Sequence, residues 1–146
     1  MKRTIQTLTA TMTAAVAFLA ISHGAQASNA GEYKAAMRDF APVIVSWAAE
    51  ADAALAAAAL KPELACTESI QELAQRGESI RADLAGMAIA APTAVRRPHQ
   101  AVTASLATMV AETRGACGRE AEALAAGAKA YQAFGAPMKV IQVFSR

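Results

Sequence analysis

The stretch that decides the fold runs from Cys66 to Cys117 and reads CTESIQELAQRGESIRADLAGMAIAAPTAVRRPHQAVTASLATMVAETRGAC. Apolar side chains recur along it at alternating steps of four and three residues, the repeat of a helix that packs along one face. The repeat comprises Cys66, Ile70, Leu73, Gly77, Ile80, Leu84 and Met87, then Val95, His99, Val102, Leu106, Val110, Thr113 and Cys117. The stretch therefore predicts two helices folded back on each other.

The two cysteines set the register of this predicted helix pair. If Cys66 faces Cys117 and the helices are antiparallel, nearly every position on one stripe meets a counterpart on the other. Gly77 then faces Leu106, and Leu84 faces His99.

The first residues have the features of a secretory signal peptide. Lys2 and Arg3 form a basic start, Thr11 to Ile21 is apolar, and Ala25-Gln26-Ala27 is a small-residue cleavage motif. The apolar run is shorter than the ~20 residues that a spanning helix needs, which disfavours a membrane anchor. We predict a signal peptide over residues 1–27 and one periplasmic or secreted domain over residues 28–146, with no further membrane span.

Removal of this segment changes the charge of the chain. The sequence holds 14 Lys and Arg against 12 Asp and Glu, and the segment takes Lys2 and Arg3 with it. The remaining chain carries 12 of each and no net charge. This balance does not favour nucleic acid as a partner.

A disulfide between Cys66 and Cys117 is the expected state of two cysteines in an exported chain. The loop that it closes has about 50 residues and contributes roughly 4 kcal/mol in the chain-entropy model.

A further helix is predicted from Gly31 to Leu60. Pro42 predicts a kink near residues 38–42 or a new helix start capped by Asp39. Pro62 should then open the next helix at its first position, after a tight corner. The antiparallel register places Trp47 opposite Gly77.

Two interpretations of the chain after Cys117 remain open. Gly115 and Gly118 favour a fold-back into a fourth helix that Gly135 and Pro137 end. Alternatively, the third helix continues to Phe134 and exposes an apolar C-terminal segment to a protein partner or to a second copy. The tail from Met138 to Phe144 is expected to be a strand or a docked extension. The predicted class is all-α: an antiparallel up-and-down bundle of three long helices plus a C-terminal helix or extension.

Familiar signatures of chemistry are missing from the sequence. It lacks C-x-x-C-H, H-E-x-x-H and a glycine-rich phosphate loop. We therefore expect a non-enzymatic binding or structural module in the periplasm or cell envelope, with no cofactor.

His99 offers the alternative function, because it lies on the apolar stripe one layer from Met37 and Met87. Histidine and methionine hold copper, or a b-type haem. In architecture and ligand types alone, the layout resembles the small periplasmic b-type four-helix cytochromes. The simpler interpretation, which we prefer, is a structural histidine bonded to a carbonyl, with the methionines as core filler.

Arg96 and Arg97 precede the predicted start of the third helix at Pro98, where an anion could bind. The alternative is a solvated loop. Glu72 and Arg76 are spaced as a surface ion pair on the second helix.

Overall fold

The computed structural model describes residues 30–146, apart from the side chains of Ala125, Ala126 and Ala128. The predicted signal peptide lies outside this range. The described chain forms α1 (Ala30–Leu60), the short 3₁₀ helix η1 (Pro62–Cys66), α2 (Glu68–Gly86), the 3₁₀ helix η2 (Met87–Ala90), α3 (Thr93–Arg114) and α4 (Ala121–Phe144). Residues 30–146 contain no strand, and the all-α prediction is confirmed.

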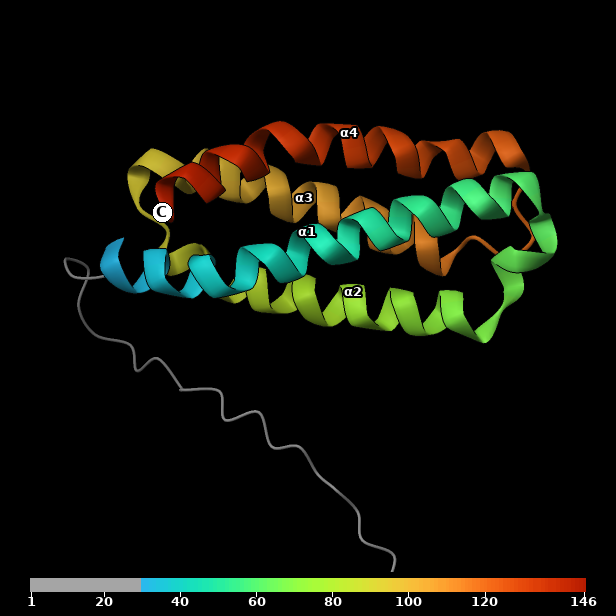
Figure 1. Cartoon of the computed structure of the whole chain (residues 1–146), viewed down its shortest axis with the longest axis horizontal. Coiled ribbons are helices and arrows are strands. Elements are labelled where there is room, and N and C mark those ends of the chain that lie inside the picture. The colour runs from blue at the N-terminus through green and yellow to red at the C-terminus, as the bar shows by residue number, and fades with distance from the viewer. Residues whose placement is uncertain (1–29) are drawn as a thin grey trace, which may run out of the picture.

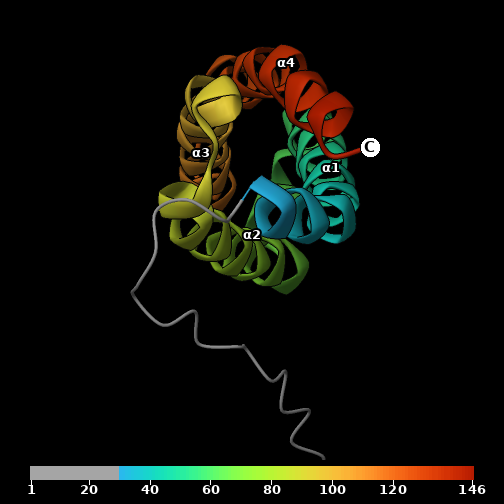
Figure 2. The same ribbon diagram turned by 90° about the vertical axis from the view of Figure 1, so that its left-hand side faces the viewer.

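Successive helices run in alternating directions along one long axis (Figure 1). Seen end-on, they form a ring in the order α1, α2, α3, α4, with α4 returning beside α1 (Figure 2). The pairs α3–α4, α1–α4 and α2–α3 are closely packed, whereas α1 and α2 approach each other at few places. The arrangement is a four-helix bundle that is loosely packed on one side, between α1 and α2.

The core draws large side chains from all four helices. Its fully buried members lie at steps of three and four residues, as an amphipathic helix requires. They include Tyr33, Met37, Ile44, Leu84, His99, Leu106, Met109, Met138 and Ile141. A second cluster, with Leu55, Ile70 and Leu124, fills the end that carries the α1–α2 corner.

α1 continues through Pro42 without interruption, so the predicted new start at Asp39 is wrong. A proline inside a helix costs about 3 kcal/mol. Met37, Ala41, Ile44 and Trp47 are buried on both sides of Pro42, and each large side chain gains about 1.5–3 kcal/mol from burial. Continuing the helix keeps all of them on the core and outweighs the lost hydrogen bond.

α1 is long and apolar enough to cross a membrane, with a mean hydropathy of 1.6 in its most apolar window. A core helix and a signal sequence pass the same test. Here α1 packs into the bundle, with Tyr33, Ile44 and Trp47 buried.

The corner between α1 and α2 is longer than predicted. Pro62 opens η1 rather than α2, and α2 begins only at Glu68. The hydroxyl of Thr67 donates to the carbonyl of Leu64 and closes this turn. Cys66 therefore lies at the end of η1, just outside the helix on which the sequence placed it.

The fold-back into a fourth helix is confirmed, and the straight extension of the third helix is wrong. α3 ends at Arg114, and Gly118 turns the chain with a φ of 79°, a conformation that glycine adopts readily. Phe134 is buried instead of exposed.

The end of the fourth helix was predicted wrongly. α4 passes Gly135 and Pro137 and ends at Phe144, so the tail is helical rather than a strand. Met138 and Ile141 are buried beyond the proline, and their burial favours continuation as it does at Pro42.

Candidate binding groove

His99 is fully engaged in hydrogen bonds in the core. Its Nε2 lies 2.9 Å from the carbonyl oxygen of Leu84, and its Nδ1 lies 3.0 Å from the hydroxyl of Tyr33. A carbonyl only accepts, so Nε2 carries the hydrogen and Nδ1 accepts from Tyr33. The side chain is 1% exposed. This geometry links α1, α2 and α3 through one imidazole.

Burial keeps this pair of side chains uncharged. It lowers the pKa of His99 below the ordinary value, and the hydrogen bond to Leu84 opposes the shift only in part. Burial also raises the pKa of Tyr33 to about 12. The arrangement fits a structural histidine.

The predicted ligands Met37 and Met87 border the same core cluster but differ in burial. Met37 is fully buried in α1, whereas Met87 is half-buried at the start of η2. Because both nitrogens of His99 are bonded, a copper or haem ligand there would have to break a bond to Leu84 or Tyr33. In residues 30–146 no three His, Cys, Asp or Glu side chains gather as a metal site.

Sequence reasoning missed Tyr33 as the partner of His99. The available signal was chemical. A tyrosine on a core stripe needs a partner for its hydroxyl, and His99 is the histidine of residues 30–146.

Arg96 and Arg97 lie inside α3, which begins at Thr93 rather than at Pro98. Both are exposed and are at least three residues from the helix start. They therefore lie at the end of the first turn and just after it, and the predicted helix start at Pro98 is wrong.

The predicted cysteine pairing is present. Cys66 and Cys117 form a disulfide with their Cα atoms 4.5 Å apart. It joins η1 to the segment between α3 and α4, so it ties the α1–α2 corner to the α3–α4 turn.

Trp47 is the side chain that separates α1 from α2. Its indole lies against Gly77, where an added Cβ would stand 2.1 Å from a ring carbon. Its Nε1 donates to the carbonyl of Leu73 over 2.9 Å. The predicted contact between Trp47 and Gly77 is confirmed, and the flat ring keeps the two backbones apart.

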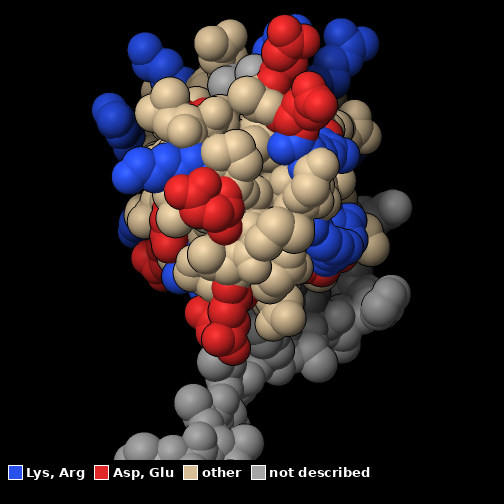
Figure 3. Space-filling model, turned by 90° about the vertical axis from the view of Figure 1, so that its right-hand side faces the viewer, with Lys and Arg blue, Asp and Glu red and all other residues tan. Residues whose placement is uncertain are grey.

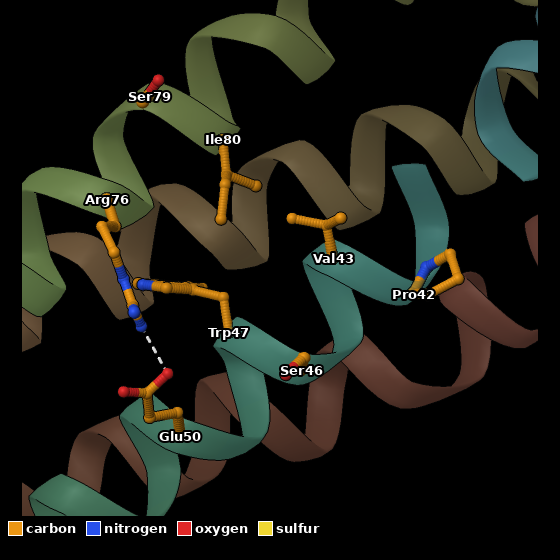
Figure 4. A pocket seen from close by; sticks show the side chains of 8 residues that line it. All are labelled: Pro42, Val43, Ser46, Trp47, Glu50, Arg76, Ser79 and Ile80. Atoms are coloured by element: carbon orange, nitrogen blue, oxygen red, sulfur yellow. Dashed lines mark hydrogen bonds and ion pairs between the residues drawn. The ribbon is translucent and has the colours of Figure 1, made fainter. Parts of the chain in front are cut away.

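An open groove of about 600 Å³ follows from this separation (Figure 4). Its lining residues are Pro42, Val43, Ser46, Trp47 and Glu50 from α1 and Arg76, Ser79 and Ile80 from α2. Val43 is 48% exposed, a high value for a valine. The groove thus has an apolar floor with polar walls.

An ion pair between Arg76 and Glu50 crosses one end of the groove (Figure 4). The predicted pair between Arg76 and Glu72 on the same helix is wrong. Arg76 instead reaches the facing helix, which lies close enough only because the corner folds α2 back along α1.

Carboxylates extend both walls beyond the groove. On α1, Glu32 and Asp39 precede Val43 by eleven and four residues, spacings that keep them on one helix face. On α2, Glu72 precedes Arg76 by four residues and Asp83 follows Ser79 by four. With Glu50, these stripes carry five carboxylates against two guanidinium groups, Arg76 and Arg38, which precedes Pro42 by four residues.

The end of the bundle beside the α1–α2 corner does not share this bias (Figure 3). At the end that carries the α1–α2 corner, acidic and basic side chains are interspersed (Figure 3). Arg81 and Arg114 pair with Glu78, and Arg119 pairs with Glu112. The excess of negative charge lies along the two helix faces that continue the groove walls.

Comparisons of the chain with protein-family models, with curated proteins and with solved structures find no match.

Proposed function

We propose that this protein is an exported, disulfide-stabilised helical bundle that acts as a non-enzymatic binding module, and that its groove binds a cationic amphipathic helix. The observation that carries the proposal is the groove itself. Its floor is lined by Val43, Trp47 and Ile80, and carboxylates continue both walls beyond it. Helix-in-groove recognition uses this combination of apolar anchors and charged edges.

The length of the acidic stripe favours a peptide over a small molecule. Glu32 and Glu50 are 18 residues apart on α1, which is about 27 Å at 1.5 Å per residue. A helix of similar length can contact both ends and the apolar floor together.

Two features support export to an oxidising compartment. The sequence begins with a signal-like segment, and the cysteines are paired. Mass spectrometry of protein recovered from the periplasm or medium should find Ser28 as the first residue. An intact N-terminus on a cytoplasmic chain would contradict export.

The binding test uses Trp47, the single tryptophan of the chain, as the reporter. A synthetic helix with leucines on one face and lysines at its edges should change Trp47 fluorescence saturably. The same peptide with glutamates for lysines should not. Val43→Asp should abolish the response, and Ile89→Asp, at a residue 89% exposed in η2, should leave it intact. Equal responses to both peptides, or none to either, would refute the proposal.

A further inference from the structure

A second exposed surface complements the groove. The outer face of α4 carries Val140 and Val143, which are 47% and 59% exposed. Small residues and bases share this face or its edges: Lys129, Ala133, Ala136 and Lys139, with Arg146 following the helix. We call this surface the α4 stripe.

The α4 stripe matches the groove in chemistry. It offers two valines among small side chains, where the groove offers the exposed Val43 beside the largely buried Trp47 and Ile80. Its bases oppose the acidic walls, and opposite charges at an interface rim favour encounter and fix register.

The two surfaces also match in spacing when α4 lies parallel to α1. The separation between Lys129 and Val140 equals the separation between Glu32 and Val43. Seating Val140 beside Val43 therefore brings Lys129 level with Glu32. The same placement puts Lys139 within one turn of Asp39 and Arg146 within one residue of Glu50.

A chain cannot fill its own groove in this way. α4 lies between α1 and α3 in the ring, while the groove lies between α1 and α2 (Figure 2). The donor of the stripe has to be another molecule.

We propose that the groove binds the α4 stripe of a second copy of this chain, so that the protein self-associates head to tail. This inference rests on the proposed function, because it names the helix that the groove takes. A head-to-tail contact uses different surfaces on the two partners and can continue from copy to copy.

The first test is sedimentation velocity of the full mature, oxidised protein over a range of concentrations. Wild type should form species that grow with concentration and shrink with added salt, since salt screens exposed charges. Val43→Asp and Val140→Asp should each weaken association at least about tenfold, as loss of a central apolar contact does. Ile89→Asp is the matched control and should associate as wild type does.

Mixing the two defective variants is the decisive test. Val43→Asp keeps a good stripe and Val140→Asp keeps a good groove, so together they should form a one-to-one dimer that does not grow. Circular dichroism of each variant checks that it is folded. If wild type associates but the mixture stays monomeric, a different surface is used and the inference is wrong.

Charge reversal tests the register. Asp39→Lys and Lys139→Glu should each weaken association about two- to fivefold, the range of an exposed ion pair. The double variant should recover most of the loss. Failure to recover would contradict the proposed register.

The failure of this inference can be told apart from that of the proposed function. A wild type that remains monomeric at every concentration overturns self-association. If its Trp47 fluorescence still responds to the lysine-edged peptide, the groove binds a foreign helix. If it responds to neither, both proposals fail.

Discussion

α1 has two neighbours in the bundle, and it packs against them by different means. Towards α4 it buries apolar side chains along its length, and Leu55 lies over Gly127 in a close approach. Towards α2 it makes few backbone approaches and is linked by polar groups: Trp47 to Leu73, and Glu50 to Arg76. Of its two neighbours in the ring, α1 thus packs less closely against α2 than against α4, and the space left between α1 and α2 is the groove.

The side chains at the two glycines account for this difference. Leu55 is flexible and fits a small hollow between α1 and α4. The indole of Trp47 is large and rigid, so α2 can rest on it only at Gly77. A wedge of this kind leaves accessible volume on both of its sides.

Removal of the Trp47 indole from between α1 and α2 should have the largest effect on stability. Trp47→Ala should lower the free energy of unfolding by about 3–5 kcal/mol, because it leaves a cavity and removes the indole hydrogen bond to the Leu73 carbonyl. Urea denaturation followed by circular dichroism measures it. A loss below about 1 kcal/mol would show that α1 and α2 do not depend on the indole.

Breaking the disulfide tests whether a bundle with loose packing between α1 and α2 needs a covalent link for its stability. Replacing Cys66 and Cys117 with serine should cost roughly 4 kcal/mol in the chain-entropy model. Before the replacement, thiol titration of the denatured, unreduced protein should find no free cysteine. Two free thiols would contradict the pairing.

Alanine at each glycine compares the two interfaces directly. Gly77→Ala should destabilise by about 1–3 kcal/mol, because its Cβ would overlap the rigid indole. Gly127→Ala meets only the end of Leu55, and the gain in helix propensity of about 1 kcal/mol offsets much of the clash. Equal losses in thermal or urea unfolding would show that the two contacts are equally rigid.

Acid should weaken the hydrogen-bonded pair of His99 and Tyr33, which links α3 to the N-terminal part of α1. This effect should be the smallest of the four. Because the pKa of His99 is lowered in the folded protein, the unfolded chain binds this proton more readily. Stability is then complete above pH about 6.5, the ordinary value, and declines as the pH falls below it. Tyr33, which faces the imidazole, stays protonated throughout this range.

The control for this prediction is His99→Gln, which cannot take up the proton. Its urea midpoint should change less between pH 7 and pH 5 than that of wild type.

Metal analysis of wild type tests the structural role of His99 directly. One equivalent of copper or haem, lost in His99→Ala, would contradict the structural role.

The sequence by itself determined the helical class, the pairing of Cys66 with Cys117 and the contact between Trp47 and Gly77. The cysteine pairing follows from the presence of two cysteines behind a signal-like segment. The helical class and the contact follow from periodicity, which specifies which face of each helix is buried whatever its neighbours are. It also placed His99 in the core beside Leu84. It failed where a local signal competed with burial, as at Pro42 and Pro137, because the apolar side chains beyond each proline gain more than the missing hydrogen bond costs.

Only the tertiary structure decided how the helices pack against one another. It paired Tyr33 with His99, moved Arg76 from Glu72 to Glu50 and opened the groove between α1 and α2. Periodicity describes one helix at a time, whereas the distance between two helices depends on the shape of the side chains between them. The groove exists because a tryptophan occupies that position, and its width depends on how the indole lies against the facing helix.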